Sequence, residues 1–303
     1  MTTASPISLA PITPSQGVRA ALPDRPVQRP AVHVAPLSYR GVVRSEWIKA
    51  TSLRSVRWTI LLTVLLGAGM AAMMAFAMRG MVPDTDAGLT EYLTAVAGFP
   101  ANLLALVFGV LGVFLFSSEY ASGMILSSLA VAPKRGLFFA GKATVVALIS
   151  AGVAAVTVAL SGLIAVLVLP ESASVLNSTQ VWTGFAGAVF MLAVVALMSF
   201  AFAGLLRSTA GAITLAVILL LVAPTVLFMV SSFTDWTWLA EVAKLLPMDL
   251  GQRVAMGLSE SASASAAAGG LIESYWGALG VLVAWAVIPL TVALVSFRVR
   301  DAK

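Results

Sequence analysis

Six long runs of uncharged, apolar residues dominate the chain and are separated by short polar stretches. Each run reaches about the 20 residues that a helix needs to cross the hydrocarbon of a bilayer. The runs are continuous in Ala, Leu and Val rather than alternating, which disfavours a transmembrane β-barrel. The pattern predicts an all-α integral membrane protein, a bundle of six transmembrane helices at residues 58–78, 96–116, 143–169, 182–206, 211–233 and 276–297.

The segment before the first run, residues 42–57, mixes apolar and basic side chains at helical spacing. This pattern favours an N-terminal interfacial helix that lies in the headgroup region of the membrane. Glu46 and Arg57 interrupt its apolar face, so an ordinary basic flank before the first span remains an alternative. The residues that we expect to define the interfacial helix are Trp47, Lys49 and Arg54.

The N-terminal tail, residues 1–41, holds seven of the fourteen prolines and no apolar run. This composition predicts a disordered segment. The tail also lacks the apolar centre of a secretory signal, so we expect the first span to stay attached as an uncleaved anchor. His33, the only histidine, lies in this tail, which cannot hold partners around it for catalysis or metal binding.

Lysine and arginine outside the runs are distributed unequally between the two sides of the membrane. Fifteen fall in the two termini, in the segment between the second and third runs and in the turn at Arg207, against three on the opposite side. Because cytoplasmic loops carry the excess of Lys and Arg, this bias places both termini in the cytoplasm. We expect a multi-pass protein of the cell membrane with residues 234–274 outside.

The composition excludes several classes of function. Hydrophobic residues make up 60% of the chain and charged residues 10%, which is far from the balance of a soluble domain. The chain has no cysteine, so disulfides, zinc-thiolate sites and iron–sulfur clusters are ruled out. The net charge of +5 suits contact with membrane lipid rather than with nucleic acid.

The apolar runs carry no group suited to catalysis or ion coupling. None contains Asp, Glu, Lys, Arg or His, so an ion-coupled carrier is disfavoured. We expect no enzyme activity, no catalytic residue, no cofactor and no metal. The stretch GLFFAGKA, residues 136–143, nearly matches a phosphate-binding loop, but Ala143 stands in place of the magnesium-binding hydroxyl and no strand precedes it.

A polar and basic stretch, residues 116–142, separates the second and third runs. Residues 118–129 fit a short helix with an apolar side that could seat in a groove of a partner protein. Pro133 would end this helix. The alternative is a solvated turn whose Lys134 and Arg135 hold the loop in the cytoplasm.

This loop resembles the cytosolic coupling loop of type 2 ATP-binding-cassette (ABC) exporter permeases. The similarity lies in an ordered pattern, E-x3-G-x5-L-x3-P-x-R-x5-G-K, formed by Glu119, Gly123, Leu129, Pro133, Arg135, Gly141 and Lys142. The stretch SEWIKATSLRSVRWT, residues 45–59, is similar to the interfacial segment of bacterial members. Six spans with a long external piece before the last also match. Met124 stands where the family often has Thr.

The resemblance implies that residues 42–303 form the transmembrane permease domain of an ABC exporter, without an ATPase site of its own. It implies two copies of a separate ABC ATPase subunit and a second permease chain, either identical or related. The uncharged spans suggest lipophilic or amphipathic cargo. The alternative is a non-transport scaffold or anchor for a cytoplasmic partner. The expected coupling residues are Glu119, Tyr120, Gly123, Met124, Leu129, Pro133 and Arg135.

Overall fold

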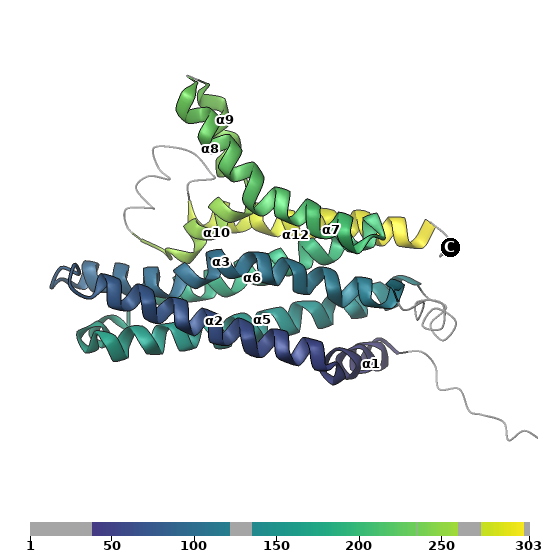
Figure 1. Cartoon of the computed structure of the whole chain (residues 1–303), viewed down its shortest axis with the longest axis horizontal. Helices are drawn as coiled ribbons and strands as arrows, with labels where there is room; N and C mark the ends of the chain where they lie inside the picture. The colour runs from purple at the N-terminus through teal and green to yellow at the C-terminus, as the bar shows by residue number, and fades with distance from the viewer. Residues whose placement is uncertain (1–37, 122–134, 235, 260–273, 300–303) are drawn as a thin grey trace, which may run out of the picture. The chain divides into compact units, whose positions relative to one another are not determined.

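The computed structural model describes residues 38–121, 135–234, 236–259 and 274–299. These residues belong to one compact unit, and every regular element within them is helical (Figure 1). Six of the helices are long and apolar enough to cross a membrane, which confirms the predicted all-α, six-span bundle. Most of the predicted tail, residues 1–37, lies outside the described residues.

A short helix, α1 (Tyr39–Ser52), precedes the first span, α2 (Arg54–Met78). The Ser38 hydroxyl caps α1 by accepting a hydrogen bond from the N–H of Gly41 at 3.1 Å. Leu53 separates the two helices because its backbone is extended, with φ −70° and ψ 122°. Arg54 therefore begins α2, although the sequence pattern had placed it in the interfacial helix.

The next spans are α3 (Asp86–Ala121), α5 (Arg135–Val168) and α6 (Thr179–Leu206), with a 3-10 turn between α5 and α6 (Pro170–Val175). Both α3 and α5 begin well before the corresponding apolar runs. Polar residues therefore extend these helices past the length that crosses hydrocarbon. The last span is α12 (Tyr275–Val299), which contains Pro289.

Helix α6 lies at the centre of the bundle and contacts α3, α5 and α12 along its length. Its residues are apolar on every side, which is typical of a helix surrounded by other helices. Close approach to α3 depends on Gly112, because a Cβ atom at that position would overlap the carbonyl group of Ala196. The largest fully buried side chains of α6 are Met191, Leu192, Met198 and Phe200.

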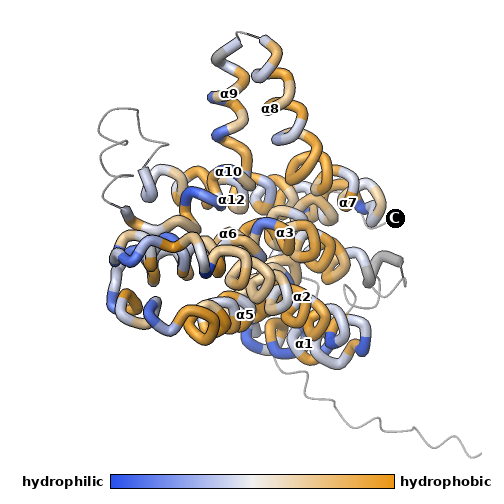
Figure 2. Tube along the Cα trace, turned by 60° about the vertical axis from the view of Figure 1, so that its left-hand side comes forward, coloured by the Kyte–Doolittle hydropathy of each residue, from blue (hydrophilic) through white to orange (hydrophobic). Residues whose placement is uncertain are grey.

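The fifth span changes its helical geometry halfway. It runs as α7 (Thr209–Val217), a π-helical turn (Ile218–Val222) and α8 (Ala223–Phe233). Pro224 favours a kink in this span, because it lacks an N–H and its ring crowds the preceding turn. The π turn lies immediately before this proline. None of the residues of α8 is buried, and α8 departs from the other spans together with α9 (Figures 1 and 2).

Two short amphipathic helices, α9 (Thr237–Lys244) and α10 (Pro247–Ala255), follow the fifth span. Proline is favoured in the first turn of a helix because its missing N–H has no intrahelical partner there, and Pro247 starts α10. Helix α10 buries Leu250 and Val254 against α6 and α12.

Candidate functional site

The loop with the family-like pattern connects α3 to α5. Glu119 and Tyr120 belong to the last turn of α3, and Arg135 is the first residue of α5. Gly123, Met124, Leu129 and Pro133 lie outside the described residues. The structure therefore describes how the two ends of the loop are anchored.

Five phenylalanines hold the two ends of the loop together. Phe116 lies just before the loop and Phe139 just after it, with their ring centroids 6.0 Å apart. All five side chains are buried, and they come from four different spans. We call this set the phenylalanine cluster; its members are Phe116 of α3, Phe138 and Phe139 of α5, Phe200 of α6 and Phe297 of α12.

The rings of the cluster meet at angles that favour aromatic contact. Phe116 meets Phe200 edge to face, with centroids 5.1 Å apart and planes at 90°. Gly204 of α6 adjoins the cluster, since an added Cβ atom would lie 3.2 Å from the ring of Phe139 and 3.6 Å from that of Phe116. Close packing of this kind transmits displacement, because there is little free volume to absorb it.

A buried ion cluster joins α1 to α5 beside these rings. The carboxylate of Glu46 contacts Nζ of Lys142 at 2.5 Å and Nζ of Lys49 at 2.7 Å. The side chains of Glu46 and Lys142 are only 3% and 7% exposed, whereas that of Lys49 is 39% exposed. Both ammonium groups lie over the ring of Phe138, at 5.4 Å for Lys142 and 5.8 Å for Lys49.

The close approach of α1 to α5 has two further supports. A Cβ atom at Gly141 would lie 2.7 Å from Cγ1 of Val42, so glycine permits the two helices to touch. The hydroxyls of Tyr39 and Thr144 form a hydrogen bond of 2.6 Å. Helix α1 is therefore fixed to the first turns of α5, directly after the loop.

The structure corrects the sequence-based interpretation of Glu46. That residue was expected to interrupt the apolar face of an interfacial helix. Instead it lies with Val42 and Ala50 on the buried face of α1, where Lys142 neutralises it. Trp47 points away from this contact and is 42% exposed.

Lys142 ended the family-like pattern and also the near-match to a phosphate-binding loop. Residues 136–143 are helical and belong to α5, and Lys142 is held by Glu46. No local signal in the sequence could reveal this pair, because the two residues lie on segments that are distant along the chain. The sequence indicates an ion pair only between Glu46 and Lys49, which lie three residues apart on one helix.

The end of the last span also reaches the loop. Arg298 of α12 lies over Gly136 of α5, where an added Cβ atom would come 2.7 Å from the guanidinium Nε. Arg207 ends α6 in the left-handed conformation, with φ 51°. Spans α3, α5, α6 and α12 thus all contribute to the base of the loop.

A metal centre is not found among the residues that the structure describes. Among the residues that the structure describes, no group of three or more His, Asp or Glu side chains could hold a metal ion. What the site can do is mechanical: it links the loop to α1 and to four spans through buried rings and an ion pair.

The comparisons with known proteins agree with this architecture. No curated protein matches the chain at a significant level. Residues 42–235 match the family described as ABC-2 family transporter protein. The match covers more than half of the chain, from α1 through the fifth span, and includes both anchored ends of the loop. With six helices long and apolar enough to cross a membrane, the chain belongs to the ABC-2 family of transporter proteins and is a multi-pass membrane permease.

Proposed function

We propose that this permease is the translocation subunit of an ABC exporter, driven by an ATPase on separate chains. The residues between α3 and α5 would receive the force that accompanies ATP binding and hydrolysis. The observation that carries the proposal is the phenylalanine cluster, which joins both ends of the loop to four spans. A displacement of the loop is thereby shared by those spans rather than absorbed locally.

Helix α1 forms the second part of the proposed coupling site. Because Glu46 pairs with Lys142, α1 moves with the first turns of α5. An ATPase subunit that touches the loop would therefore also displace α1. Permeases of this family typically work with an ABC ATPase, and we propose that two copies of such an ATPase bind here.

We assign ATP hydrolysis to the partner because the stretch that resembles a phosphate-binding loop has neither the conformation nor the available lysine of one. The near-match at residues 136–143 is a helix whose Phe138 and Phe139 are buried and whose lysine bonds to Glu46. A phosphate-binding loop instead needs exposed backbone N–H groups and a free lysine. This arrangement supports a permease that relies on an external ATPase.

The exposed second half of the fifth span, α8, supports a second permease chain. In a span of 25 residues, the whole of α8 lacks a buried residue, while α7 buries Ala212 and Ala216 against its neighbours. A second copy of this chain, related by a two-fold axis, would cover α8 with the same surface.

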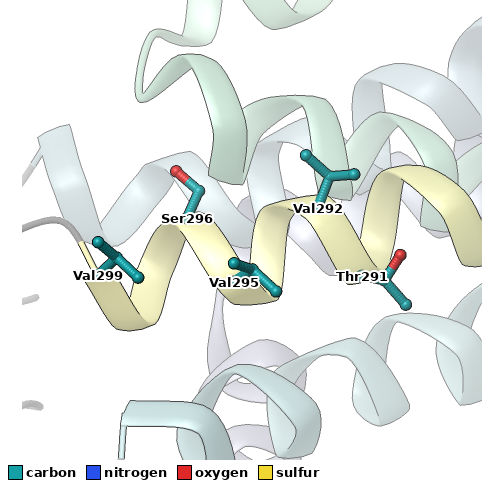
Figure 3. Close-up of a pocket in the computed structure, with 5 residues that line it drawn as sticks. All are labelled: Thr291, Val292, Val295, Ser296 and Val299. Atoms are coloured by element: carbon teal, nitrogen blue, oxygen red, sulfur yellow. The ribbon is translucent and has the colours of Figure 1, made fainter.

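The cargo that suits the spans is lipophilic or amphipathic. A shallow hollow of about 460 Å³ runs along the outer face of α12, lined by Val292, Val295 and Val299 with the hydroxyls of Thr291 and Ser296 (Figure 3). The Thr291 hydroxyl donates to the carbonyl of Ile288 at 2.8 Å, so it is already satisfied. Such a surface offers no counter-charge to a strongly ionic solute.

The proposed orientation places both termini and the α3–α5 loop in the cytoplasm. It rests on the excess of Lys and Arg at that end of the bundle. Reporter fusions after Thr85, Ser174 and Ser263 should report the outside, and fusions after Arg135, Arg207 and Lys303 the cytoplasm. One clear inversion among them would contradict this topology.

Purification from native membranes in mild detergent tests the function most broadly. We expect an ABC ATPase subunit to co-purify with the chain in equal amount. A scaffold or anchor would bring down a cytoplasmic partner without ATPase sequence. An ion-coupled carrier would transport after the ATPase gene has been deleted, which would overturn the proposal.

A further inference from the structure

The outer face of α2 carries a stripe of exposed side chains, in which two arginines are followed by a tryptophan and then by two leucines. Arg54, Arg57, Trp58, Leu61 and Leu65 are all exposed and occupy positions i, i+3, i+4, i+7 and i+11, which share one face of a helix. The opposite face of α2 is buried against the bundle through Val56, Thr63, Gly67, Ala71 and Ala75. The stripe is therefore unpartnered by the described residues of the chain.

The first four residues of the stripe line a hollow of about 370 Å³. The end of α1 orients the side chain of Arg57, because one guanidinium nitrogen of Arg57 donates to the carbonyl oxygen of Ser52 at 3.4 Å. Arg54 stands one turn before it on the same face. Two guanidinium groups side by side provide several N–H donors for the oxygens of a phosphate group.

The chain segment that forms this hollow is positively charged. Between Ser38 and Leu65 the chain has one carboxylate, that of Glu46, and it is buried between Lys142 and Lys49. No acidic side chain of this stretch can therefore neutralise Arg54 or Arg57. An anion from outside the stretch is the partner that its charge favours.

From these observations we propose that the stripe binds one anionic phospholipid. The phosphate group would lie between Arg54 and Arg57, the indole of Trp58 at the level of the ester groups, and an acyl chain along Leu61 and Leu65. The stripe spans about 16 Å at 1.5 Å per residue, close to half of the roughly 30 Å hydrocarbon core plus part of the headgroup layer. In the orientation proposed above this is a lipid of the cytoplasmic leaflet.

Lipid binding at this position bears on the coupling site. The hollow lies at the elbow where α1 meets α2, and α1 is fixed to α5 through Glu46. A bound lipid would therefore hold the elbow in place in the membrane. The inference does not depend on the ATPase. Lipid binding can therefore fail its test while the proposed function stands, and the proposed function can fail while lipid binding stands.

Native mass spectrometry of the full chain in mild detergent tests the proposal. Phosphatidylglycerol is titrated against wild type and the Arg54→Gln, Arg57→Gln double variant, with phosphatidylcholine of the same acyl chains and inorganic phosphate as further probes. We expect phosphatidylglycerol to bind wild type more tightly than phosphatidylcholine. The double variant should lose roughly thirtyfold in affinity for phosphatidylglycerol at low salt, at about fivefold per arginine.

A matched control uses the other exposed arginine pair. Arg40→Gln with Arg44→Gln removes the same charge from α1, where no hollow adjoins it, and should change the affinity less than about twofold. Arg54→Lys with Arg57→Lys should retain most of the binding and shows that a folded variant is being compared. Equal loss in both arginine pairs, equal binding of the two lipids, or binding of free phosphate as tight as that of the lipid would each overturn the proposal.

Discussion

At the scale of single residues, Glu46 is the residue whose interpretation the structure changes most. In the sequence it looks like a defect in an amphipathic helix, and in the structure it is the link between α1 and α5. A carboxylate removed from water needs a close counter-charge and hydrogen-bond donors, and Lys142 and Lys49 supply both. Neither Glu46 nor Lys142 can be removed alone without leaving the other group buried with less compensation.

We predict that Glu46→Gln and Lys142→Met each destabilise the permease by about 3 kcal/mol, as expected when one partner of a buried pair is removed. The double variant Glu46→Gln, Lys142→Met should recover much of this loss, because neither buried charge is then left without its partner. Thermal unfolding in detergent measures all three variants.

The exposed pair of Glu241 and Lys244 provides the control for this experiment. Its atoms are 2.8 Å apart, but the side chain of Glu241 is 67% exposed. Glu241→Gln should cost less than about 1 kcal/mol. If Glu46→Gln is equally mild, the buried pair does not hold α1 to α5.

At the scale of helices, the approach of α3 to α6 decides how the bundle closes. Gly112 lies against the backbone of Ala196, and Gly187 and Gly184 lie against the backbone of α10. Small residues permit these contacts, since apolar helices in lipid associate chiefly through close packing. Helix α10 is seated on α6 in the same way.

We predict that Gly112→Val greatly lowers the amount of folded protein in the membrane, because the added side chain must push α3 away from α6. Gly152→Val of α5 is the matched control, since a Cβ atom there meets nothing within 4 Å. Membrane abundance and the elution profile in detergent measure both. Equal abundance of the two variants would contradict the close contact.

The spans could be predicted from sequence because each depends only on a continuous apolar run. The partner of Lys142 could not, because the pairing of two helices distant in the chain depends on tertiary packing. Pro224 indicates that the helix is irregular near Ile218–Val222, but it does not indicate that the irregularity is a π turn. Helix α10 could not be predicted with the same certainty, because a proline such as Pro247 suits both the residue after a helix and the first turn of the next one.

At the scale of the whole molecule, the exposed surface of α8 is the feature that the proposed second permease chain would explain. Phe228 and Phe233 are 72% and 81% exposed, although α8 belongs to the most apolar of the six spans. The stacked indoles of Trp236 and Trp238 follow at the end of the same span and are also exposed. A second chain would cover this surface.

We predict that α8 lies at the contact between two copies. The chain has no cysteine, so single cysteines can be placed at Val226, Phe228, Met229 and Phe233 without background. At least one should form a disulfide-linked dimer on oxidation in membranes, because Cα atoms less than about 7 Å apart can be bridged. Leu167→Cys, exposed on α5, is the control and should stay monomeric.

The central claim is that an ATPase acts on the loop between α3 and α5. Glu119→Lys reverses a charge at the end of α3, and Gly123→Val puts a branched side chain in place of a glycine of the loop. Charge pairs at desolvated interfaces are worth about 1.5 kcal/mol or more, so Glu119→Lys should weaken ATPase association about tenfold or more. Glu171→Lys in the exposed turn after α5 is the matched charge reversal and should have no effect.

The most direct measurement is ATP hydrolysis by the purified complex in the presence and absence of membrane-derived cargo, together with the abundance of each variant in the membrane. The account predicts that Glu119→Lys and Gly123→Val insert at wild-type abundance and lose cargo-stimulated hydrolysis, while Glu171→Lys keeps it. Full stimulation in both loop variants at normal abundance would contradict the account, since the loop would then be a solvated connector.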